Sequence, residues 1–588
     1  MKRPLFYLLL AIAFLMRLAL IPNPGFEADV SFWKSWGLAI LDMGVIKGLP
    51  LTNFNYPTPF AYFLGFMVWI YRLFADPHNF NEFWNNSNLL FLTITKIFPI
   101  LADFGIAGAF LYIGRHAKRL SFPVFNYALC SIIYLLNPLG LFDGALWGQI
   151  DSVGVLLFLL ALLASLHRFS FLAGIIFMIA MMTKLQNMIY GPIFFLFIWQ
   201  YLGYENLIKA LGGAMLAFGT LNGQFFLNHQ AGRVLESITG NYDYFPWLSL
   251  NAYNPWWIFS GADGQQVSDK VMAIGIIKAK TVGLLAFSSM YLFAMLQQIK
   301  EKKGFLYGFL TSLILVNASF FLLQTQSHDR YAFPLSVFLL LWFPFTKIPF
   351  KLFAMLYSLF TLVYFYNLHT ALIVNYPKNG IMLLNSFNTP FLTIIASIIL
   401  TSLLIIFCIY LARSSRFISY FLLLIVGLFI SAILFLNTPL MFQKPVSLTK
   451  ITPITATAGY GSRQINMPAN AAFGFDKWSP LSVQYAFYKT GIGTHAPARD
   501  VYDINRKFKT FSTDYGVDTN GGAQGSVIFE VYGDEKLLFR SELIKRFELP
   551  KHAEIDVTGV KILELVVTDG GNGNFDDHAD WLNPILIP

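Results

Sequence analysis

The chain has 588 residues, of which 56% are hydrophobic and only 12% are charged. Soluble domains are about half apolar and a quarter charged, so this composition excludes an ordinary soluble protein and indicates a membrane protein. The net charge of +9 does not indicate nucleic acid binding, because residues 438–588 hold 15 of the 41 basic and 17 of the 32 acidic residues. The basic excess lies in the apolar part, where it is typical of loops that face the cytoplasm and anionic lipid.

Apolar runs with the length of membrane spans recur from the N-terminus to residue 437. The first is expected to be a retained helix, because no small-residue cleavage site follows it. The runs predict an α-helical polytopic membrane domain over 1–437 with about thirteen spans, at 5–22, 89–113, 122–140, 152–167, 170–184, 188–203, 208–226, 278–298, 304–323, 331–346, 349–366, 390–412 and 417–437.

Basic clusters set the expected orientation of these spans. With thirteen crossings, the clusters at 115–119, 300–303, 346–351 and 413–416 all fall on the side of the N-terminus. The positive-inside rule then predicts a multi-pass plasma membrane protein with a cytoplasmic N-terminus and an extracytoplasmic tail. A further apolar segment, 59–75, would invert this pattern as a span, so we expect it to lie along the outer interface or to be re-entrant.

The first expected external loop carries two carboxylates, Glu27 and Asp29, just beyond the first span. A carboxylate at the membrane rim can act as general base toward an acceptor hydroxyl, and a solvated loop carboxylate is the alternative. In an extended segment the two side chains would point to the same face. Asp103 lies inside an apolar run, which indicates either a polar cavity or an interhelical hydrogen bond.

Two further segments place polar groups at expected external span ends. Residues 142–152 combine Asp143 with Trp147, Gln149 and Asp151, a set suited to a sugar or phosphate. Lys184 and Gln186 follow, and a lysine on the outer side is a candidate phosphate contact.

The segments 249–257 and 326–331 complete the expected outer surface. Asn251 and Asn254 lie among aromatic residues, which suit sugar rings or an interfacial aromatic belt. The short loop at 326–331 holds His328, Asp329 and Arg330, and an arginine there can bind a phosphate in bidentate fashion.

Hydropathy falls after residue 438, and short alternating runs at 526–533, 553–557 and 561–569 predict strands. Residues 438–588 are therefore expected to form an extracytoplasmic all-β sandwich domain. The acidic run Asp569, Asn572, Asn574, Asp576 and Asp577 could bind Ca²⁺, although such a cluster is more often a turn. No other cofactor and no metal in the membrane domain is expected.

The order of motifs over about 1–345 resembles membrane glycosyltransferases of the GT-C superfamily. The motifs are the early acidic residue, the YPTPFAY segment at 56–62, WGQID at 147–151, KLQ at 184–186 and HDRY at 328–331. The resemblance implies transfer of a sugar from a polyprenyl-phosphate donor to an extracytoplasmic glycan or lipid-linked acceptor of the cell envelope. It implies Asp29 as the base, with Tyr56 near the substrate and His328, Arg330 and Lys184 near the donor phosphate. Asn55 stands where the family often has a second acidic residue.

The tail over about 450–588 resembles the NPCBM carbohydrate-binding module through its segments 491–504, 511–520, 525–538 and 568–581. The candidate carbohydrate-binding residues in and beside these segments are His495, Asp518, Asp577, His578, Asp580 and Trp581. Two rival functions are a transporter or flippase of a lipid-linked sugar and a sugar receptor without catalytic activity.

Overall fold

The computed structural model describes residues 3–240, 245–414, 416–437, 445–469, 480–484 and 486–588. The chain divides into two compact units. The first comprises Met1–Phe245, Ser249–Ala262 and Ala286–Val426, and the second comprises Pro246–Leu248, Asp263–Leu285 and Gly427–Pro588. The predicted boundary at 438 lies outside the described residues.

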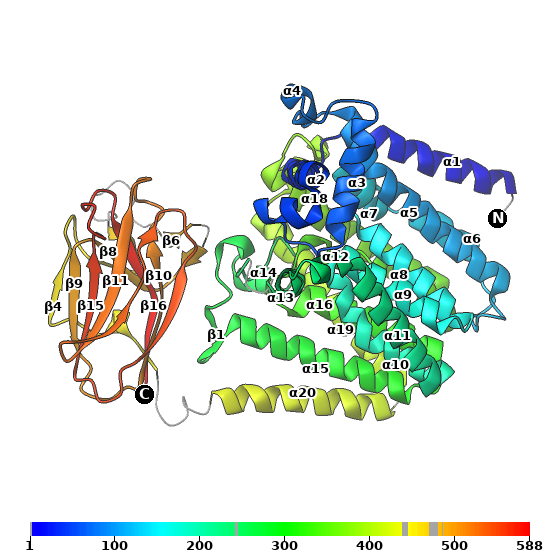
Figure 1. Ribbon diagram of the computed structural model, residues 1–588. Coiled ribbons are helices and arrows are strands. Elements are labelled where there is room, and N and C mark those ends of the chain that lie inside the picture. The colour runs from blue at the N-terminus through cyan, green and yellow to red at the C-terminus, as the bar shows by residue number, and fades with distance from the viewer. Residues whose placement is uncertain (1–2, 241–244, 415, 438–444, 470–479, 485) are drawn as a thin grey trace. The chain divides into compact units, whose positions relative to one another are not determined.

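The first unit is helical (Figure 1). Its helices up to the middle of the chain are α1 (Arg3–Leu20), α2 (Glu27–Gly48), η1 (Leu49–Leu51), α3 (Phe60–Arg72), α4 (Phe80–Phe83), α5 (Leu89–His116), α6 (Tyr127–Leu135), α7 (Pro138–Gly140), η2 (Leu141–Trp147), α8 (Asp151–Leu166), α9 (Ser170–Thr183), η3 (Leu185–Tyr190), α10 (Gly191–Leu202), α11 (Tyr204–Leu221), α12 (Gly223–Leu227) and α13 (Ala231–Thr239). The later helices, some of which belong to the second unit, are α14 (Pro255–Phe259), η4 (Gly264–Gln266), α15 (Ala279–Lys300), α16 (Phe305–Leu323), η5 (Asp329–Ala332), α17 (Leu335–Trp342), η6 (Phe343–Phe345), α18 (Phe350–Asn375), η7 (Met382–Phe387), α19 (Pro390–Ser414) and α20 (Arg416–Leu436).

Seven helices within the described residues are long and apolar enough to cross a membrane, or eight if the bent pair Tyr127–Leu135 and Pro138–Trp147 is one span. The structure therefore does not confirm thirteen spans. Several expected spans are shorter helices, such as α9 with 14 residues and α17 with 8 residues. Hydropathy follows apolar composition, whereas helix length depends on where the backbone breaks, as at Lys184 and Gly203.

The segment expected at the outer interface forms α3, whose 13 residues span about 20 Å and are too short for a bilayer core of about 30 Å. The helix packs closely on α2, which the sequence had placed in a loop. A Cβ atom at Gly37 would lie 2.7 Å from the carbonyl oxygen of Leu64, and one at Gly65 would lie 2.7 Å from Ile40 Cγ2. The glycines therefore allow α2 and α3 to form a close pair.

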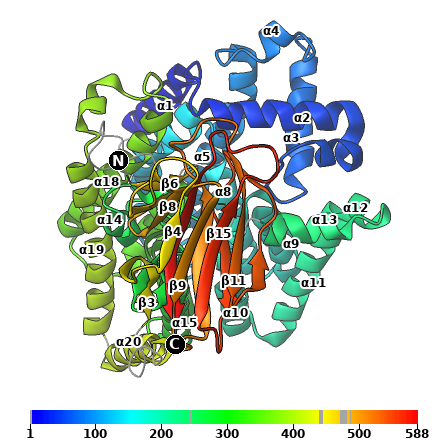
Figure 2. The ribbon, with the colours of Figure 1, turned by 90° about the vertical axis from the view of Figure 1, so that its left-hand side faces the viewer.

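The strands at the end of the chain form a β-sandwich, which confirms the all-β prediction for this part (Figures 1 and 2). One sheet has the order β14-β10-β16-β8-β5 with β3 beside β16, and the other has the order β12-β11-β15-β9-β4 with β13 beside β11. Alternating side chains such as Phe511, Phe529 and Trp581 fill the space between the sheets. The strands of the chain are β1 (Met272–Ile274), β2 (Ile277–Lys278), β3 (Val446–Ser447), β4 (Thr455–Thr457), β5 (Gln464–Ile465), β6 (Leu481–Val483), β7 (Ala486–Tyr488), β8 (Gly491–His495), β9 (Ala498–Asp503), β10 (Thr510–Val517), β11 (Ser526–Gly533), β12 (Lys536–Arg540), β13 (Ile544–Lys545), β14 (Lys551–Asp556), β15 (Ile562–Thr568) and β16 (His578–Ile587).

Candidate functional site

Asp29 lies at the centre of a polar cluster in the helical unit. It belongs to the first turn of α2, where a carboxylate is favoured by the helix dipole. Its Oδ2 atom accepts hydrogen bonds from Arg330 Nη1 at 3.1 Å, Gln149 Nε2 at 2.5 Å and Trp147 Nε1 at 3.4 Å. All three bonds end on Oδ2, so Oδ1 takes part in none of them. The Asp29 side chain is 27% exposed and can be reached by a ligand.

A π-helix brings Trp147 and Gln149 to Asp29. The π-helix η2 ends at Gly148, whose φ of 91° is left-handed. The N–H groups of Gly148 and Gln149 both donate to the carbonyl oxygen of Asp143, at 3.1 and 2.9 Å, and this turn projects Gln149 toward α2. The Arg330 guanidinium lies 5.1 Å from the centre of the Trp147 ring, a cation–π distance. Single π-helical turns are common at functional sites because they shift the register of the side chains.

A second ion pair joins Asp151 to Lys184. Lys184 Nζ lies 2.8 Å from each carboxylate oxygen of Asp151, and Gln186 Nε2 donates to Asp151 Oδ1 at 2.7 Å. Asp151 begins α8, and Lys184 stands at the break between α9 and η3. The pair is almost fully buried, with 0% of the Asp151 and 11% of the Lys184 side chain exposed. The lysine charge is thus already balanced by a carboxylate.

The loop before η5 is held by main-chain pairing with residues 250–251. The N–H of Asp329 donates to the carbonyl oxygen of Leu250 at 3.1 Å, and His328 forms β-bridges to Leu250 and Asn251. Burial, with smaller effects of Arg330 and Lys184, lowers the pKa of His328 to about 3, so this imidazole is neutral near pH 7. Burial also raises the pKa of Asp329 to about 6. The neutral ring lies beside Tyr331, with ring centres 5.3 Å apart.

Glu27 is separated from this cluster. Because α2 begins at Glu27, a two-residue step turns the side chain by about 200°, and the expectation of an extended segment with both carboxylates on one face was wrong. Glu27 accepts hydrogen bonds from Asn86 at 2.5 Å and Asn379 at 2.9 Å. These amides tie α2 to two other loops.

Asp103 also has a structural environment. It is fully buried on α5, with Arg17 Nε at 2.9 Å from Oδ2 and the Tyr134 hydroxyl at 2.7 Å from Oδ1. Arg17 additionally donates to the carbonyl oxygen of Leu135 at 2.8 Å. The geometry favours the interhelical alternative for Asp103 over substrate binding.

The remaining predicted residues differ in their relation to Asp29. Tyr56 stacks on Phe60, with ring centres 4.7 Å apart, and lies within electrostatic range of Asp29 and Arg330. The Asn254 side chain instead caps α14 by accepting from the N–H of Trp257 at 3.1 Å. Asn251 contributes its main chain to the pairing with His328 and to a bond from the Asn367 amide. Tyr56 therefore belongs to the site region, whereas the structure gives both asparagines supporting roles.

Two buried cations inside the expected spans were missed by the sequence analysis. Arg17 is the partner of Asp103, and Lys96 Nζ donates to the carbonyl oxygens of Asn23 at 2.6 Å and Leu146 at 2.7 Å. An ionisable residue inside an apolar run always requires a partner, and this signal was present in both positions. Lys96 joins the end of α1 to the π-helix that carries Trp147.

Most of the predicted carbohydrate-binding residues of the β-sandwich are buried. Trp581 is 2% exposed and packs edge-on against Phe529, so its ring cannot stack on a sugar. Asp580, on the opposite face of β16, is 0% exposed. It pairs in register with Gly493, which is covered by residues 467–469. Asp518 and Asp577 accept main-chain hydrogen bonds from Ser482 and Ser526. His495 is 5% exposed, and its ring contacts that of the partly buried His578 on the neighbouring strand.

The acidic run proposed for Ca²⁺ forms turn contacts. Asp569 Oδ1 accepts from the N–H of Gly571 at 3.0 Å, and Asp577 Oδ1 accepts from the N–H of Ser526 at 2.8 Å. These carboxylates bond to main-chain donors, as side chains do in Asx turns.

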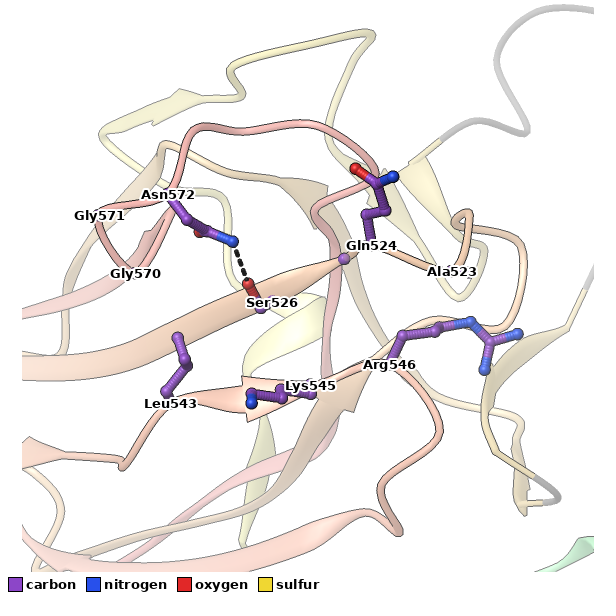
Figure 3. A pocket seen from close by; sticks show the side chains of 10 residues that line it. Ala523, Gln524, Ser526, Leu543, Lys545, Arg546, Gly570, Gly571 and Asn572 are labelled. Carbon is purple, nitrogen blue, oxygen red and sulfur yellow. Dashed lines mark hydrogen bonds between the residues drawn. The ribbon is translucent and has the colours of Figure 1, made fainter.

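A pocket of about 410 Å³ opens at one end of the sandwich (Figure 3). Asn572 Nδ2 donates to Ser526 Oγ at 2.9 Å across it, and Lys545 and Leu543 lie on the neighbouring segment. Gly570 and Gly571 have φ values of 65° and 90°, so this wall is a left-handed turn without side chains. The lining residues are Ala523, Gln524, Gly525, Ser526, Leu543, Lys545, Arg546, Gly570, Gly571 and Asn572.

Comparisons with known proteins concern the β-sandwich. Residues 444–587 match the family model described as NPCBM/NEW2 domain. A protein of Renibacterium salmoninarum, whose name describes an endo-alpha-N-acetylgalactosaminidase, is 27% identical over 104 residues, which are 18% of this chain and only 7% of that protein.

Two solved structures from Clostridium perfringens align with 24% of the chain. A CBM51 domain of GH95 in complex with methyl-galactose is 29% identical and is covered over 99% of its length, with a TM-score of 0.22. CBM51-2 of ZmpB with GlcNAc and INT domains is 26% identical and is covered over 31% of its length, also with a TM-score of 0.22. On the family match, residues 444–587 are a carbohydrate-binding module of the NPCBM type.

Proposed function

We propose that the chain is an integral membrane glycosyltransferase of the GT-C type. It would transfer a sugar from a polyprenyl-phosphate donor to an extracytoplasmic glycan or lipid-linked acceptor. The observation that carries the proposal is the convergence on Asp29 of side chains from two segments far apart in sequence, one with Trp147 and Gln149 and the other with Arg330. The carbohydrate-binding module on the same chain supports a substrate that contains a glycan.

Asp29 has the geometry of a general base in this reaction. The acceptor hydroxyl would attack the anomeric carbon, the bond from that carbon to the phosphate oxygen would break, and the phosphate would leave with the electron pair. The hydroxyl proton would pass to Asp29 Oδ1, the oxygen that the three donors leave open. Because Trp147 and Gln149 bond to Oδ2, the carboxylate is held in one orientation.

Arg330 is the better candidate for the donor phosphate. Lys184 is already matched by both oxygens of Asp151, whereas Arg330 presents a planar group of five N–H donors, of which Nη1 bonds to Asp29. Charge on the leaving phosphate would be neutralised by this guanidinium. His328, being neutral, can serve as hydrogen-bond donor or acceptor but not as a cation.

The module would bind glycan at the pocket between Asn572 and Lys545. Amide and ammonium groups there can bond to sugar hydroxyls, and Phe575, which is 75% exposed, offers a ring face on the loop between β15 and β16 that also carries Asn572. Weak binding at this pocket would keep the acceptor glycan near the membrane.

Purified full-length protein in lipid nanodiscs tests the proposal. Labelled polyprenyl-phosphate sugars are incubated with glycan acceptors or with membrane lipid extract, and the label transferred is measured. Transfer by the natural sequence and loss of transfer in Asp29→Asn are expected. Movement of an intact labelled lipid across a liposome bilayer, with no transfer to any acceptor, would instead identify a flippase.

A further inference from the structure

Several buried acceptor atoms on the segments that build the site have no hydrogen-bond donor among the described residues. They are both carboxylate oxygens of Asp143 on η2, Oε1 of Gln149 and Oε1 of Gln186. Buried polar atoms in proteins are normally satisfied by a protein partner, water or a ligand. Because the two amides bond to Asp29 and Asp151, these acceptors indicate a place for hydrogen-bond donors.

The orientation of the two amides is fixed by their partners. Gln149 Nε2 faces the Asp29 carboxylate and Gln186 Nε2 faces the Asp151 carboxylate. An ionised carboxylate only accepts hydrogen bonds, so the amide nitrogens must point to it and the amide oxygens must point elsewhere. The direction of the two amide oxygens is thus set by the carboxylates rather than by an arbitrary amide assignment.

Asp143 connects this set to the charged groups of the site. It is 0% exposed and stands on the π-helix η2, where its main-chain carbonyl already holds the turn to Gln149. Its side chain lies within electrostatic range of Asp151, Lys184 and Arg330. The main-chain role explains the position of Asp143, but it leaves the carboxyl group itself without a structural function.

We propose that Asp143, Gln149 Oε1 and Gln186 Oε1 form an acceptor-lined subsite for the hydroxyl groups of the donor sugar, and that Asp143 contacts this sugar directly. The inference rests on the proposed function and extends it. A phosphate is excluded from such a subsite because it would face carboxylate and amide oxygens. The phosphate is assigned to Arg330, whose Nε also lacks a hydrogen bond among the described residues.

The test compares lipids with and without the sugar on full-length protein in nanodiscs. Affinities are measured for polyprenyl phosphate alone and for polyprenyl phosphate that carries glucose, galactose, mannose or N-acetylglucosamine. We expect the natural sequence to bind at least one sugar lipid more tightly than polyprenyl phosphate. Asp143→Asn and Gln186→Leu should weaken that binding by about tenfold and leave polyprenyl phosphate unchanged, whereas Arg330→Ala should weaken both.

Gln298→Leu is the matched control. Gln298 is also buried, donates through Nε2 to the carbonyl oxygen of Ile193 and has an Oε1 atom without a partner among the described residues. It lies near the C-terminal end of α15 and bonds to neither Asp29 nor Asp151. It should change no lipid affinity. The unfolding midpoints of all variants are recorded. Asp143→Ser takes the place of Asp143→Asn if that variant does not fold.

The outcomes separate the two proposals. Unchanged sugar-lipid binding in folded Asp143 and Gln186 variants would overturn the subsite. The subsite would also be overturned if the natural protein bound every sugar lipid no better than polyprenyl phosphate, even if transfer were observed. Absence of transfer with every donor, together with sugar-dependent binding through Asp143, would leave the subsite in place and refute the glycosyltransferase.

Discussion

Asp29 and Glu27 show how strongly function depends on local conformation. In α2 only Asp29 faces Gln149 and Arg330, while Glu27 is held by Asn86 and Asn379. Two carboxylates that are nearly equivalent in the sequence therefore receive different roles.

The first prediction concerns these two carboxylates. Asp29→Asn keeps the shape of the side chain but removes its basicity, so turnover should fall by about 100-fold or more while donor binding is retained. Glu27→Gln keeps one oxygen that accepts from Asn379, and the Asn86 amide can turn over to accept from the new NH₂ group, so most of the turnover should be retained. Steady-state transfer rates and donor affinity are measured for both variants. Equal activity of natural protein and Asp29→Asn would refute the assigned base.

Arg330 carries the second prediction. Arg330→Lys keeps a positive charge but loses the planar set of donors that matches a phosphate, so the KM for the donor should rise about tenfold or more with a smaller change for the acceptor. Lys184→Met should act differently, because it leaves Asp151 as a buried carboxylate without its cation and should lower the unfolding midpoint. Initial rates at varied donor and acceptor concentrations distinguish these cases. A rise in acceptor KM alone would assign Arg330 to the acceptor.

At the scale of elements, α9 and α11 are in backbone contact. A Cβ atom at Gly213 would lie 2.0 Å from the carbonyl oxygen of Phe171, whereas one at the adjacent Gly212 would meet nothing within 4 Å. The two helices can approach this closely only because Gly213 has no side chain, as in the small-residue contacts of membrane helices.

These neighbouring glycines supply the third prediction. Gly213→Ala should separate α9 from α11 and lower the unfolding midpoint in detergent by several degrees. Gly212→Ala introduces the same methyl group into open space and should be neutral or slightly stabilising, since alanine favours the helix. The thermal unfolding of both variants is compared with that of the natural sequence. Equal loss in the two variants would show that helix propensity, and not the contact, decides the effect.

Some features of the helices and strands could be predicted from the sequence and others could not. The grouping of Asp29, Gln149 and Arg330 could be predicted because polar groups at the ends of apolar runs are few and the order of the motifs resembles that of the GT-C superfamily. The number of spans could not be predicted, since an apolar run through Asn137 and Pro138 contains a 44° bend that composition does not reveal. The burial of Trp581 could not be predicted either, because it depends on the register of β16, which places this residue in the sandwich core.

At the scale of the whole molecule, the membrane orientation is the fourth prediction. Cys130 and Cys408 are both buried, so single exposed cysteines can be labelled against a low background. Lys118→Cys should react only with a reagent that crosses the membrane, and Lys507→Cys should react with an impermeant reagent on intact cells. Labelling of both positions from the same side would refute the predicted topology. The experiment also decides whether an odd or an even number of spans separates the two positions.

The module supplies the fifth prediction, which concerns pH. Burial, opposed by the hydrogen bond from Ser526, raises the pKa of Asp577 from 3.8 to about 6. The native state therefore binds this proton more tightly than the unfolded state does. The resulting stabilisation of the native state is fully present below pH 3.8 and is lost as the pH rises through about 6, by about 3 kcal/mol at most. Residues 445–588 expressed alone should fold, and Asp577→Asn should stabilise them more at pH 7.5 than at pH 4.5. Denaturant unfolding of both proteins at the two pH values checks the sign, and a stabilisation that is equal at both would contradict it.

The contact between Arg330 and Asp29 has a kinetic consequence. Arg330 Nη1 holds Asp29 Oδ2 at 3.1 Å, so a phosphate would bind through the remaining N–H groups of the guanidinium and lie beside the carboxylate, with Oδ1 still open. An acceptor hydroxyl would then be positioned by both Oδ1 and the anomeric carbon only after the donor lipid has bound. Transfer should accordingly follow a compulsory order, with polyprenyl phosphate competing against the donor but not against the acceptor.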